Sequence, residues 1–348
     1  MEQFDYNKVL PTLMTPEIMN AISGIHEYRG KQELYLATEP DTMDRLCEIA
    51  RIQSTKASNK IENISTSDKR LRELMAQKIE PKNRNEREIS GYRLVLDMIH
   101  ESHDHISITP NVILQLHRDL YQYLNVGFAG NWKDSDNIIV EMSETGERRT
   151  RFIPTSAVAT PYAVENLCET YNETIMERRY DPLLIAALFT FDFVSIHPFT
   201  DGNGRMSRLL TLLLLYRSNY LVGKYVSIEA GIEKTKETYY EALQASSVGW
   251  NEGENDYKPF VTYLLGIISA SYKTLSERVE IMSGSQSNED KLRIFFANSL
   301  GLMTKREIMD ANPNMSQKTI ERVLQKLQDE GTVQKVGAAR QTKYVRIF

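Results

Sequence analysis

The stretch SIHPFTDGNGRMSRLL, residues 195–210, decides how the rest of the chain is arranged. It places His197 just ahead of a loop in which glycines flank Asn203, and such a loop can turn sharply and present its N–H groups to a ligand. Residues 206–216 follow without Gly or Pro and are rich in Leu, which predicts a buried helix. The loop therefore leads into a helix N-terminus, where free N–H groups and the helix dipole favour phosphate.

Charged side chains in this stretch indicate nucleotide chemistry. Arg205 and Arg208 are three residues apart, so they lie on one helical face and can bind successive phosphates. His197 can accept a proton from a hydroxyl, since an ordinary histidine titrates near pH ~6.5. Asp201 adds one carboxylate, which together with phosphate oxygens and waters suits Mg²⁺ better than Zn²⁺. The structural alternative is a buried histidine followed by a turn into a helix.

Residues 197–208 resemble the Fic family signature, His-Pro-Phe-x-Asp-Gly-Asn-Gly-Arg-x-x-Arg, and match every defined position. The resemblance implies a mostly α fold with a Fic-type helical core and a β-hairpin flap. It also implies transfer of AMP from ATP to a Ser, Thr or Tyr hydroxyl of a protein, the chain itself included, with release of pyrophosphate. His197 would be the general base and Asp201 would hold Mg²⁺. The anion hole for the α-phosphate would be formed by Gly202, Asn203 and Gly204. Arg205 would bind the β-phosphate and Arg208 the γ-phosphate.

A second motif lies upstream, in SNKIEN, residues 58–63. Ser58, Glu62 and Asn63 fill the defined positions of [Ser/Thr]-x-x-x-Glu-[Gly/Asn], which resembles the inhibitory motif that precedes many Fic cores. A pair between Glu62 and Arg208 would withdraw the γ-phosphate ligand and place negative charge where that phosphate should lie. In some relatives the corresponding Glu also positions a water that removes AMP. The structural alternative is a solvated helical glutamate.

Residues 137–141 and 149–153 flank a turn-rich segment, residues 143–147, and this pattern predicts a β-hairpin. The resemblance implies that the hairpin is a flap that holds the target segment by strand addition, while a purely structural hairpin is the alternative. Lys133 stands where many relatives carry Arg, which leaves the target-side contacts open.

Residues 237–243 contain Tyr239 and Tyr240 and resemble the element that walls the adenine pocket in the family. Aromatic faces suit a purine ring, although tyrosines within a helix more often serve packing. Trp250 and Asn251 follow closely and are further candidates for closing that pocket.

The C-terminal part of the chain is basic, with eleven Lys/Arg and five Asp/Glu in residues 291–348, whereas the whole chain has a net charge of −5. The sequence predicts three helices at residues 290–300, 304–311 and 316–330, followed by strands at 332–336 and 343–347. This order resembles a winged helix-turn-helix domain. Its candidate recognition residues are Gln317, Lys318, Thr319 and Arg322. Positive charge favours DNA, but a protein partner or dimerisation through the wing is an equal alternative.

The predicted organisation has four parts: an N-terminal helical region with the inhibitory helix, a Fic catalytic core, a linker and a winged-helix domain. Their boundaries are residues 1–85, 86–282, 283–290 and 291–348.

Composition is that of an ordinary globular protein, with 41% apolar and 26% charged residues. The sequence shows no apolar run long enough for a membrane span and no leader in residues 1–6, and it contains two cysteines, too few for a disulfide framework. We therefore expect a cytoplasmic protein with no membrane partner, and a homodimer is one option for its oligomeric state.

Three functions remain open at this point. The leading one is an ATP-dependent protein adenylyltransferase. The second is an enzyme that removes AMP with the same site, and the third is a nucleotide-sensing regulator that binds DNA. The presence of His197 argues against the third, because a sensor needs no base there.

Overall fold

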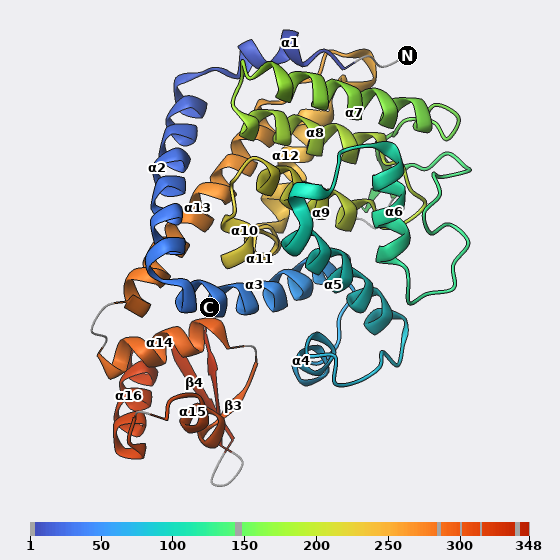
Figure 1. Cartoon of the computed structure of the whole chain (residues 1–348). Helices are drawn as coiled ribbons and strands as arrows, with labels where there is room; N and C mark the ends of the chain where they lie inside the picture. Colours follow the sequence, from blue (N-terminus) through green and yellow to red (C-terminus); the bar gives the residue numbers. More distant parts are fainter. Residues whose placement is uncertain are drawn as a thin grey trace.

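The computed structural model describes residues 4–142, 148–283, 287–299, 301–313, 315–337 and 342–347. The described chain is mostly helical, as expected (Figure 1). The turn at residues 143–147 and residues 284–286 of the expected linker lie outside the described residues. Within the described residues, no helix combines the length and the apolar character needed to cross a bilayer.

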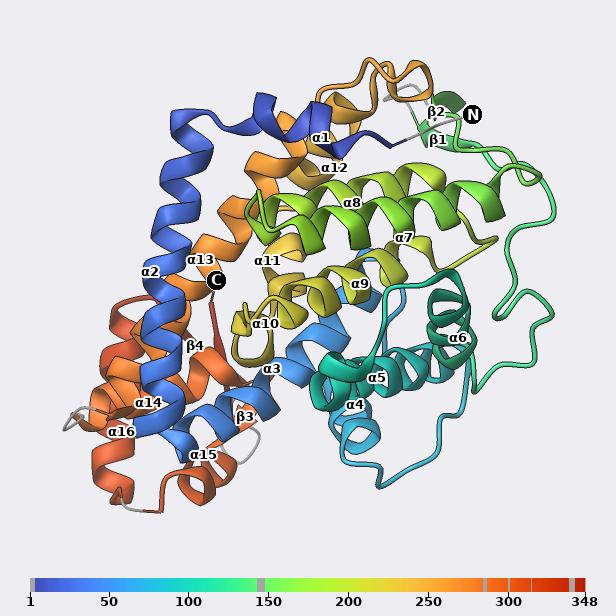
Figure 2. The ribbon, with the colours of Figure 1, turned by 45° about the horizontal axis from the view of Figure 1, so that its top comes forward.

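Two antiparallel helices, α8 (Pro182–Ile196) and α9 (Asn203–Arg217), lie at the centre of the larger part. Helix α8 is apolar all round and almost every side chain in it is buried, which is the pattern of a helix enclosed by others. Helix α9 confirms the buried helix expected from residues 206–216. Figures 1 and 2 show how further helices surround this pair. These are α1 (Tyr6–Val9), α2 (Pro16–Thr38), α3 (Pro40–Ile61), α4 (Asp68–Met75), α5 (Arg84–Ser102), α6 (Pro110–Leu120), α7 (Thr160–Glu177), α10 (Val222–Tyr225), α11 (Ile228–Lys234), α12 (Lys236–Ser247) and α13 (Lys258–Ser283).

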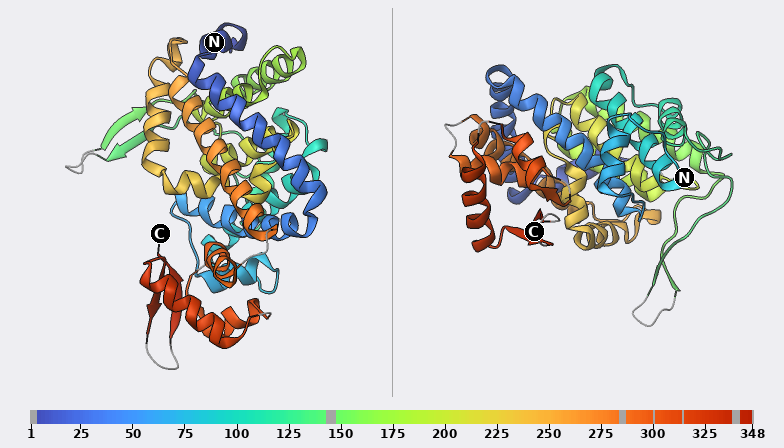
Figure 3. Two further views of the ribbon diagram at one scale, coloured as in Figure 1. Left: turned by 90° about the vertical axis from the view of Figure 1, so that its left-hand side faces the viewer. Right: turned by 90° about the horizontal axis from the view of Figure 1, so that it is seen from below.

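The predicted hairpin is confirmed: β1 (Ile139–Met142) pairs antiparallel with β2 (Arg148–Phe152), with Val140 opposite Thr150. Its strands stand out from the helical body (Figure 3). Ile138 and Val140 are 56% and 51% exposed. Since successive strand residues point to opposite faces, the residue between them, Ile139, faces the body.

The C-terminal part contains three helices and a three-stranded antiparallel sheet with the order β3-β5-β4. The elements are α14 (Asn288–Asn298), β3 (Met303–Thr304), α15 (Lys305–Ala311), α16 (Gln317–Asp329), β4 (Val333–Val336) and β5 (Lys343–Arg346). The three helices and two strands expected from the sequence are present, while the two-residue strand β3 was missed. These elements bury their own hydrophobic cluster, which is distinct from the main core.

A buried carboxylate joins separate segments of the larger part. Asp192 of α8 is fully buried and accepts hydrogen bonds from Tyr6 Oη (2.9 Å), Trp250 Nε1 (2.8 Å) and Tyr257 Oη (2.9 Å). A carboxylate buried in an apolar helix needs such partners, because an unpaired buried charge is costly. The three donors come from α1, from the short helix η3 (Trp250–Glu252) and from the segment before α13. A charged group in an apolar helix thus ties the N-terminal segment to a loop more than two hundred residues away.

Replacement of Asp192 by Leu should destabilise the fold strongly, because it removes the carboxylate that accepts three buried hydrogen bonds. Each lost bond to a charged acceptor contributes about 1.5–3 kcal/mol, so we expect a loss of several kcal/mol in the free energy of unfolding. Asp192→Asn keeps an acceptor oxygen and should lose clearly less. Urea denaturation of the two variants checks this order. Equal stability of wild type and Asp192→Leu would contradict the role assigned to the carboxylate.

Candidate active site

The turn between α8 and α9 has two residues in the left-handed backbone region. His197 ends α8 with a φ of 51°, and Gly202 precedes α9 with a φ of 86°. A Cβ atom at Gly202 would lie 3.0 Å from both Cε2 and Oη of Tyr121, so both the backbone angle and the space favour glycine. Helix α9 starts directly after this glycine, and no side chain caps it in the described part of the chain. Its first N–H groups therefore lack helical partners and remain free to bind an anion.

The side chain of Asn203 holds this turn together. Its Oδ1 accepts from the Phe199 N–H at 2.9 Å, and its Nδ2 donates to the Phe199 carbonyl at 2.7 Å. The side chain is 97% buried. Any contribution of Asn203 to phosphate binding would thus come from its backbone N–H.

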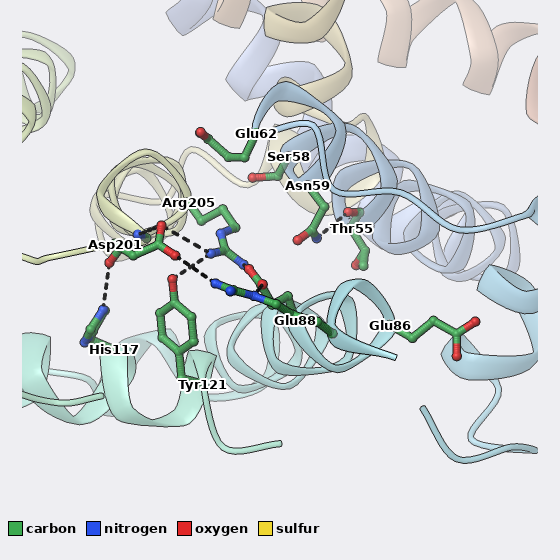
Figure 4. Close-up of polar contacts among 12 residues, drawn as sticks. Thr55, Ser58, Asn59, Glu62, Glu86, Glu88, His117, Tyr121, Asp201 and Arg205 are labelled. Atoms are coloured by element: carbon green, nitrogen blue, oxygen red, sulfur yellow. Dashed lines mark hydrogen bonds and ion pairs between the residues drawn. The ribbon is translucent and has the colours of Figure 1, made fainter. Parts of the chain in front are cut away.

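A neutral histidine, His117, supports the turn from helix α6. Its Nδ1 accepts from the Gly130 N–H at 3.0 Å, so Nε2 carries the proton and donates to the Asp201 carbonyl, also at 3.0 Å (Figure 4). Burial lowers the pKa of His117 to about 4. The imidazole stacks on the Phe199 ring, with 3.7 Å between the ring centroids. Sequence reasoning missed this residue, because an isolated histidine in an amphipathic helix carries no motif.

Lys133, the departure from the family pattern, contacts the same turn. Its Nζ donates to the Ile196 carbonyl at 3.2 Å and to Asn137 Oδ1 at 2.8 Å, and its N–H donates to the Pro198 carbonyl at 2.9 Å. Burial lowers the pKa of this lysine to about 8. Lys133 therefore positions the residues around His197 in the described state.

His197 itself is kept neutral. Burial lowers its pKa to about 4, and its Nδ1 lies 3.3 Å from the Val194 carbonyl. That contact requires the proton on Nδ1, which leaves the Nε2 lone pair as the acceptor. The geometry thus suits a general base at neutral pH.

A cavity of about 240 Å³ opens beside His197. It brings together side chains from helices α3, α9 and α12, the end of α8 and the hairpin. Six predicted site residues line it: Glu62, His197, Gly204, Arg208, Tyr239 and Tyr240. The other predicted site residues do not line it: Ser58, Asn63, Asp201, Gly202, Asn203 and Arg205.

Arg208 meets the upstream motif inside this cavity. Its Nη2 lies 2.8 Å from Glu62 Oε1 and donates to the Ser58 carbonyl at 2.9 Å, while its Nε donates to Ser58 Oγ at 2.8 Å. Arg208 is 3% exposed, and Glu62 keeps a third of its side chain exposed. Burial alone would lower the pKa of Arg208, but the charge and hydrogen bond of Glu62, together with Tyr239 and Tyr92, outweigh burial and raise that pKa. The predicted pair between these two motifs is therefore present.

Two local features bring Glu62 to this position. Asn63 has a φ of 61°, a conformation that Asn tolerates, and α3 therefore ends with Glu62 at its C-terminus. On the other side, a Cβ atom on Gly204 would lie only 2.2 Å from Glu62 Oε1. The carboxylate can reach the α9 N-terminus because Gly204 has no side chain.

Asp201 and Arg205 belong to a separate polar cluster on the other side of the turn (Figure 4). Arg205 is 1% exposed; its Nη1 lies 2.8 Å from Glu88 Oε2 and its Nη2 donates to Tyr121 Oη at 2.7 Å. Asp201 is 45% exposed, accepts from the Gly202 N–H at 2.7 Å and lies 3.6 Å from Arg84. In the described state Glu88 thus holds the Arg205 side chain, and sequence reasoning missed Glu88. The contact of Arg205 with a β-phosphate stays a prediction.

The remaining wall is aromatic and polar. Tyr239 and Tyr240 of α12 line it together with Arg151 of β2, whose guanidinium donates to the Tyr240 carbonyl. Sequence reasoning missed several lining residues: Arg151, Phe191, Val194, Gln244 and Ser247. Helical spacing from Tyr240 points to two of them, Gln244 and Ser247. Trp250 and Asn251 do not line this cavity. Trp250 binds Asp192, and Asn251 donates to the Ile153 carbonyl at 3.2 Å.

Comparison with known proteins gives the same family as the motif. Residues 107–215 match the Fic/DOC family. The chain is 29% identical over 200 residues to a protein adenylyltransferase fic-1 of Caenorhabditis briggsae, covering 55% of this chain and 33% of that protein. It is 30% identical over 173 residues to the protein of that name from Caenorhabditis elegans, covering 48% and 28%. The chain therefore spans about a third of the length of these curated relatives.

A solved structure shows the same fold. The crystal structure of a Fic family protein from Desulfovibrio desulfuricans G20 matches 96% of this chain and 97% of its own, with a TM-score of 0.63 and 20% sequence identity. The matched residues include the turn of residues 197–208, and three residues of that turn line the cavity: His197, Gly204 and Arg208. The chain carries a Fic/DOC family domain over residues 107–215.

Proposed function

We propose that this protein transfers AMP from ATP to a Ser, Thr or Tyr hydroxyl of a protein and that Glu62 inhibits the reaction by pairing with Arg208. The observation that carries the proposal is the cavity in which a neutral His197, the N-terminus of α9 and Arg208 face one space. The adenylyltransferase names of the two nematode relatives support the same chemistry.

The proposed reaction needs one proton acceptor and stabilisation of phosphate charge. His197 Nε2 takes the proton from the target hydroxyl, whose oxygen attacks the α-phosphorus as the bond to pyrophosphate breaks. The N–H groups of Asn203 and Gly204, and that of Gly202 once it is released from Asp201 Oδ1, bind the α-phosphate oxygens, where charge is concentrated during transfer. Tyr239 and Tyr240 offer aromatic faces for the adenine. The products are the AMP-modified protein, pyrophosphate and a protonated His197.

Asp201 fits the expected Mg²⁺. It is half exposed, and the described residues contain no group of three or more His, Cys, Asp and Glu placed to hold a metal ion. A single carboxylate with phosphate oxygens and waters is a common Mg²⁺ environment. When bound, Mg²⁺ would neutralise charge on the pyrophosphate leaving group. Arg205, next to Asp201, would bind the β-phosphate only after partial release from Glu88.

The inhibitory role of Glu62 follows from charge. Its carboxylate lies 2.8 Å from the guanidinium that would bind the γ-phosphate, and it places a like charge against that phosphate. ATP bound around this obstacle would be shifted, and a displacement of ~1 Å can cost on the order of 100-fold in rate.

The hairpin supports the target side of the proposal. Its exposed residues Ile138 and Val140 offer apolar contacts, and strands outside a larger sheet can pair with an extended peptide. Such pairing fixes the target hydroxyl near His197 with little demand on the target sequence.

One observation favours a second activity of the same site. Glu62 lines the cavity with a third of its side chain exposed, so it can hold a water as well as block a phosphate. Removal of AMP by that water is the alternative to AMP transfer.

For the C-terminal part we propose a winged helix, with residues 291–348 as a separate domain. The order of α14, α15 and α16, the three-stranded sheet and the separate hydrophobic cluster support this. Lys318 and Arg322 are exposed on α16, where either DNA or a protein partner can contact them.

Glu62→Gly should increase AMP transfer by at least about 100-fold, because Arg208 becomes free to bind the γ-phosphate. Incubation with α-³²P-labelled ATP, Mg²⁺ and cell lysate measures this as label on the protein itself and on targets. Glu233→Gly is the matched control. Glu233 lies on α11 and pairs at 2.6 Å with Lys60, which is on α3 close to Glu62. Its replacement removes this ion pair and leaves the contacts of Arg208 unchanged. If Glu62→Gly is no faster than wild type, Glu62 is not inhibitory.

His197→Ala in the Glu62→Gly background should lower the labelling rate by about 10²–10⁴-fold while ATP affinity stays within a few-fold. Label incorporation and equilibrium binding of ATP check the two halves of this expectation. Undiminished labelling would remove His197 from the mechanism.

The pH dependence should show a base with a low pKa. His197 must be neutral to act, and its pKa of about 4 lies below the ordinary 6.5, so activity should persist as the pH falls through 6.5. In Glu62→Gly the loss of a nearby negative charge lowers this pKa further. The acid limb of kcat/KM for that variant reports the free-enzyme pKa. An acid limb with a pKa of 6.5 or above would contradict the role of His197 as a buried base with a lowered pKa.

A further inference from the structure

A buried carboxylate, Glu229, lies behind helix α3 and takes no part in the reaction proposed above. It is 1% exposed and belongs to the first turn of α11. Three hydroxyls from separate segments donate to it. Tyr92 Oη lies 2.9 Å from Oε1, while Ser54 Oγ and Ser227 Oγ lie 2.7 Å and 3.1 Å from Oε2. These neutral donors satisfy its hydrogen bonds, and its buried charge favours a cation that it can reach through them.

Helix α3 connects this carboxylate with the guanidinium of Arg208. Ser54 and Ser58 are four residues apart and therefore lie on one face of α3. Ser54 donates to Glu229, whereas Ser58 accepts from Arg208 twice, through its hydroxyl from Nε at 2.8 Å and through its carbonyl from Nη2 at 2.9 Å. The carboxylate thus holds α3 one turn before the residue that holds the guanidinium.

Tyr92 of α5 makes a second connection between the same two groups. The Ser58 hydroxyl donates to the Tyr92 oxygen, and the Tyr92 hydroxyl donates to Glu229. Burial and the charge of Glu229 raise the pKa of Tyr92 well above its usual value, so the phenol keeps the proton that it donates. The donors therefore run in one direction, from Arg208 through two hydroxyls to the carboxylate. In such a chain each hydrogen bond polarises the next.

The contacts with Ser58 leave one nitrogen of Arg208 directed to the nucleotide side. Its Nη1 lies beside Gly204, 3.2 Å from where a Cβ atom of that residue would be. Gly204 lies in the first turn of α9 and lines the cavity. Glu62 binds Nη2, and its departure leaves both bonds to Ser58 in place. The guanidinium then stays oriented toward the N-terminus of α9.

We propose that Glu229 is a positioning residue that orients the Arg208 guanidinium for the γ-phosphate of ATP once Glu62 withdraws. This role rests on the proposed function, in which Arg208 binds that phosphate. Glu229 acts through the hydroxyls of Tyr92 and Ser58, and it does not line the cavity itself. Charge-assisted hydrogen bonds to phosphate depend on geometry, so a guanidinium without this support should bind the γ-phosphate less tightly.

The test is the calorimetric affinity for Mg²⁺-ATP and Mg²⁺-ADP in the full chain. The reference is His197→Ala/Glu62→Gly, in which no transfer occurs and the competing carboxylate is absent. Addition of Tyr92→Phe removes one oxygen atom. It should lower the preference for ATP over ADP by at least about 3-fold, the loss expected for one weakened hydrogen bond, while ADP affinity stays within about 2-fold. Glu229→Gln should act in the same direction. A merely structural role would change both affinities together.

Tyr272→Phe in the same reference is the matched control. It removes a phenol oxygen that is equally buried and donates to Gln32 at 3.1 Å, away from Arg208. This variant should keep the ATP preference of the reference. If Glu229→Gln does not fold, Ser54→Ala takes its place, because it removes the donor to the other oxygen of Glu229.

The outcomes separate this role from the proposed function. A reference variant that prefers ATP, and keeps the preference with Tyr92→Phe and with Glu229→Gln, would overturn the role of Glu229 alone. The same holds if Tyr272→Phe loses as much preference as Tyr92→Phe. A reference variant that binds ATP and ADP equally would remove Arg208 as the γ-phosphate ligand, and the role of Glu229 would fall with it.

Discussion

A buried guanidinium requires an anion beside it, and the candidate active site is organised around this requirement at Arg208. The side chain is 3% exposed, and in the described state Glu62 and Ser58 satisfy it. Both partners come from helix α3, far away in the sequence, so the pair fixes α3 against α9. The same positive charge, pointing into the cavity, is what a nucleotide phosphate would need. Under the proposed function, the Glu62–Arg208 pair of the resting state and the bound nucleotide would compete for this guanidinium.

The turn that carries His197 is held by two neutral side chains, His117 and Asn203, and by one lysine, Lys133. His117 bridges the Gly130 N–H and the Asp201 carbonyl as an uncharged imidazole, and Asn203 closes the loop through its amide. Lys133 contacts the same turn through its Nζ and its N–H, and on the far side of the turn Glu88 binds Arg205. The α9 N-terminus, His197 and the Glu62–Arg208 pair face the cavity together with Arg151 and the polar side chains of α12.

The sequence predicted the parts of the site that lie close together in the chain or carry a motif. Residues 197–208 form the expected turn and helix, and Glu62 reaches Arg208. Tyr239 and Tyr240 line the cavity, as expected from their motif. Sequence reasoning could not find His117, Glu88 and Arg151, because their roles depend on which helix faces which after folding. It offered Trp250 and Asn251 as candidates for closing the adenine pocket, whereas Trp250 binds Asp192 and Asn251 donates to the Ile153 carbonyl. The strand β3 was missed because two residues carry no periodicity.

The central claim is that the Glu62 carboxylate occupies the place of the γ-phosphate. Calorimetric affinities for Mg²⁺-ATP and Mg²⁺-ADP test it most directly, measured in His197→Ala and in His197→Ala/Glu62→Gly so that no transfer occurs. We expect the two nucleotides to bind His197→Ala with nearly equal affinity, because the γ-phosphate meets Glu62. In the double variant ATP should gain about 10-fold or more over ADP through Arg208. If removal of Glu62 raises the affinities for ATP and ADP equally, or raises neither affinity, the carboxylate does not stand in for the γ-phosphate.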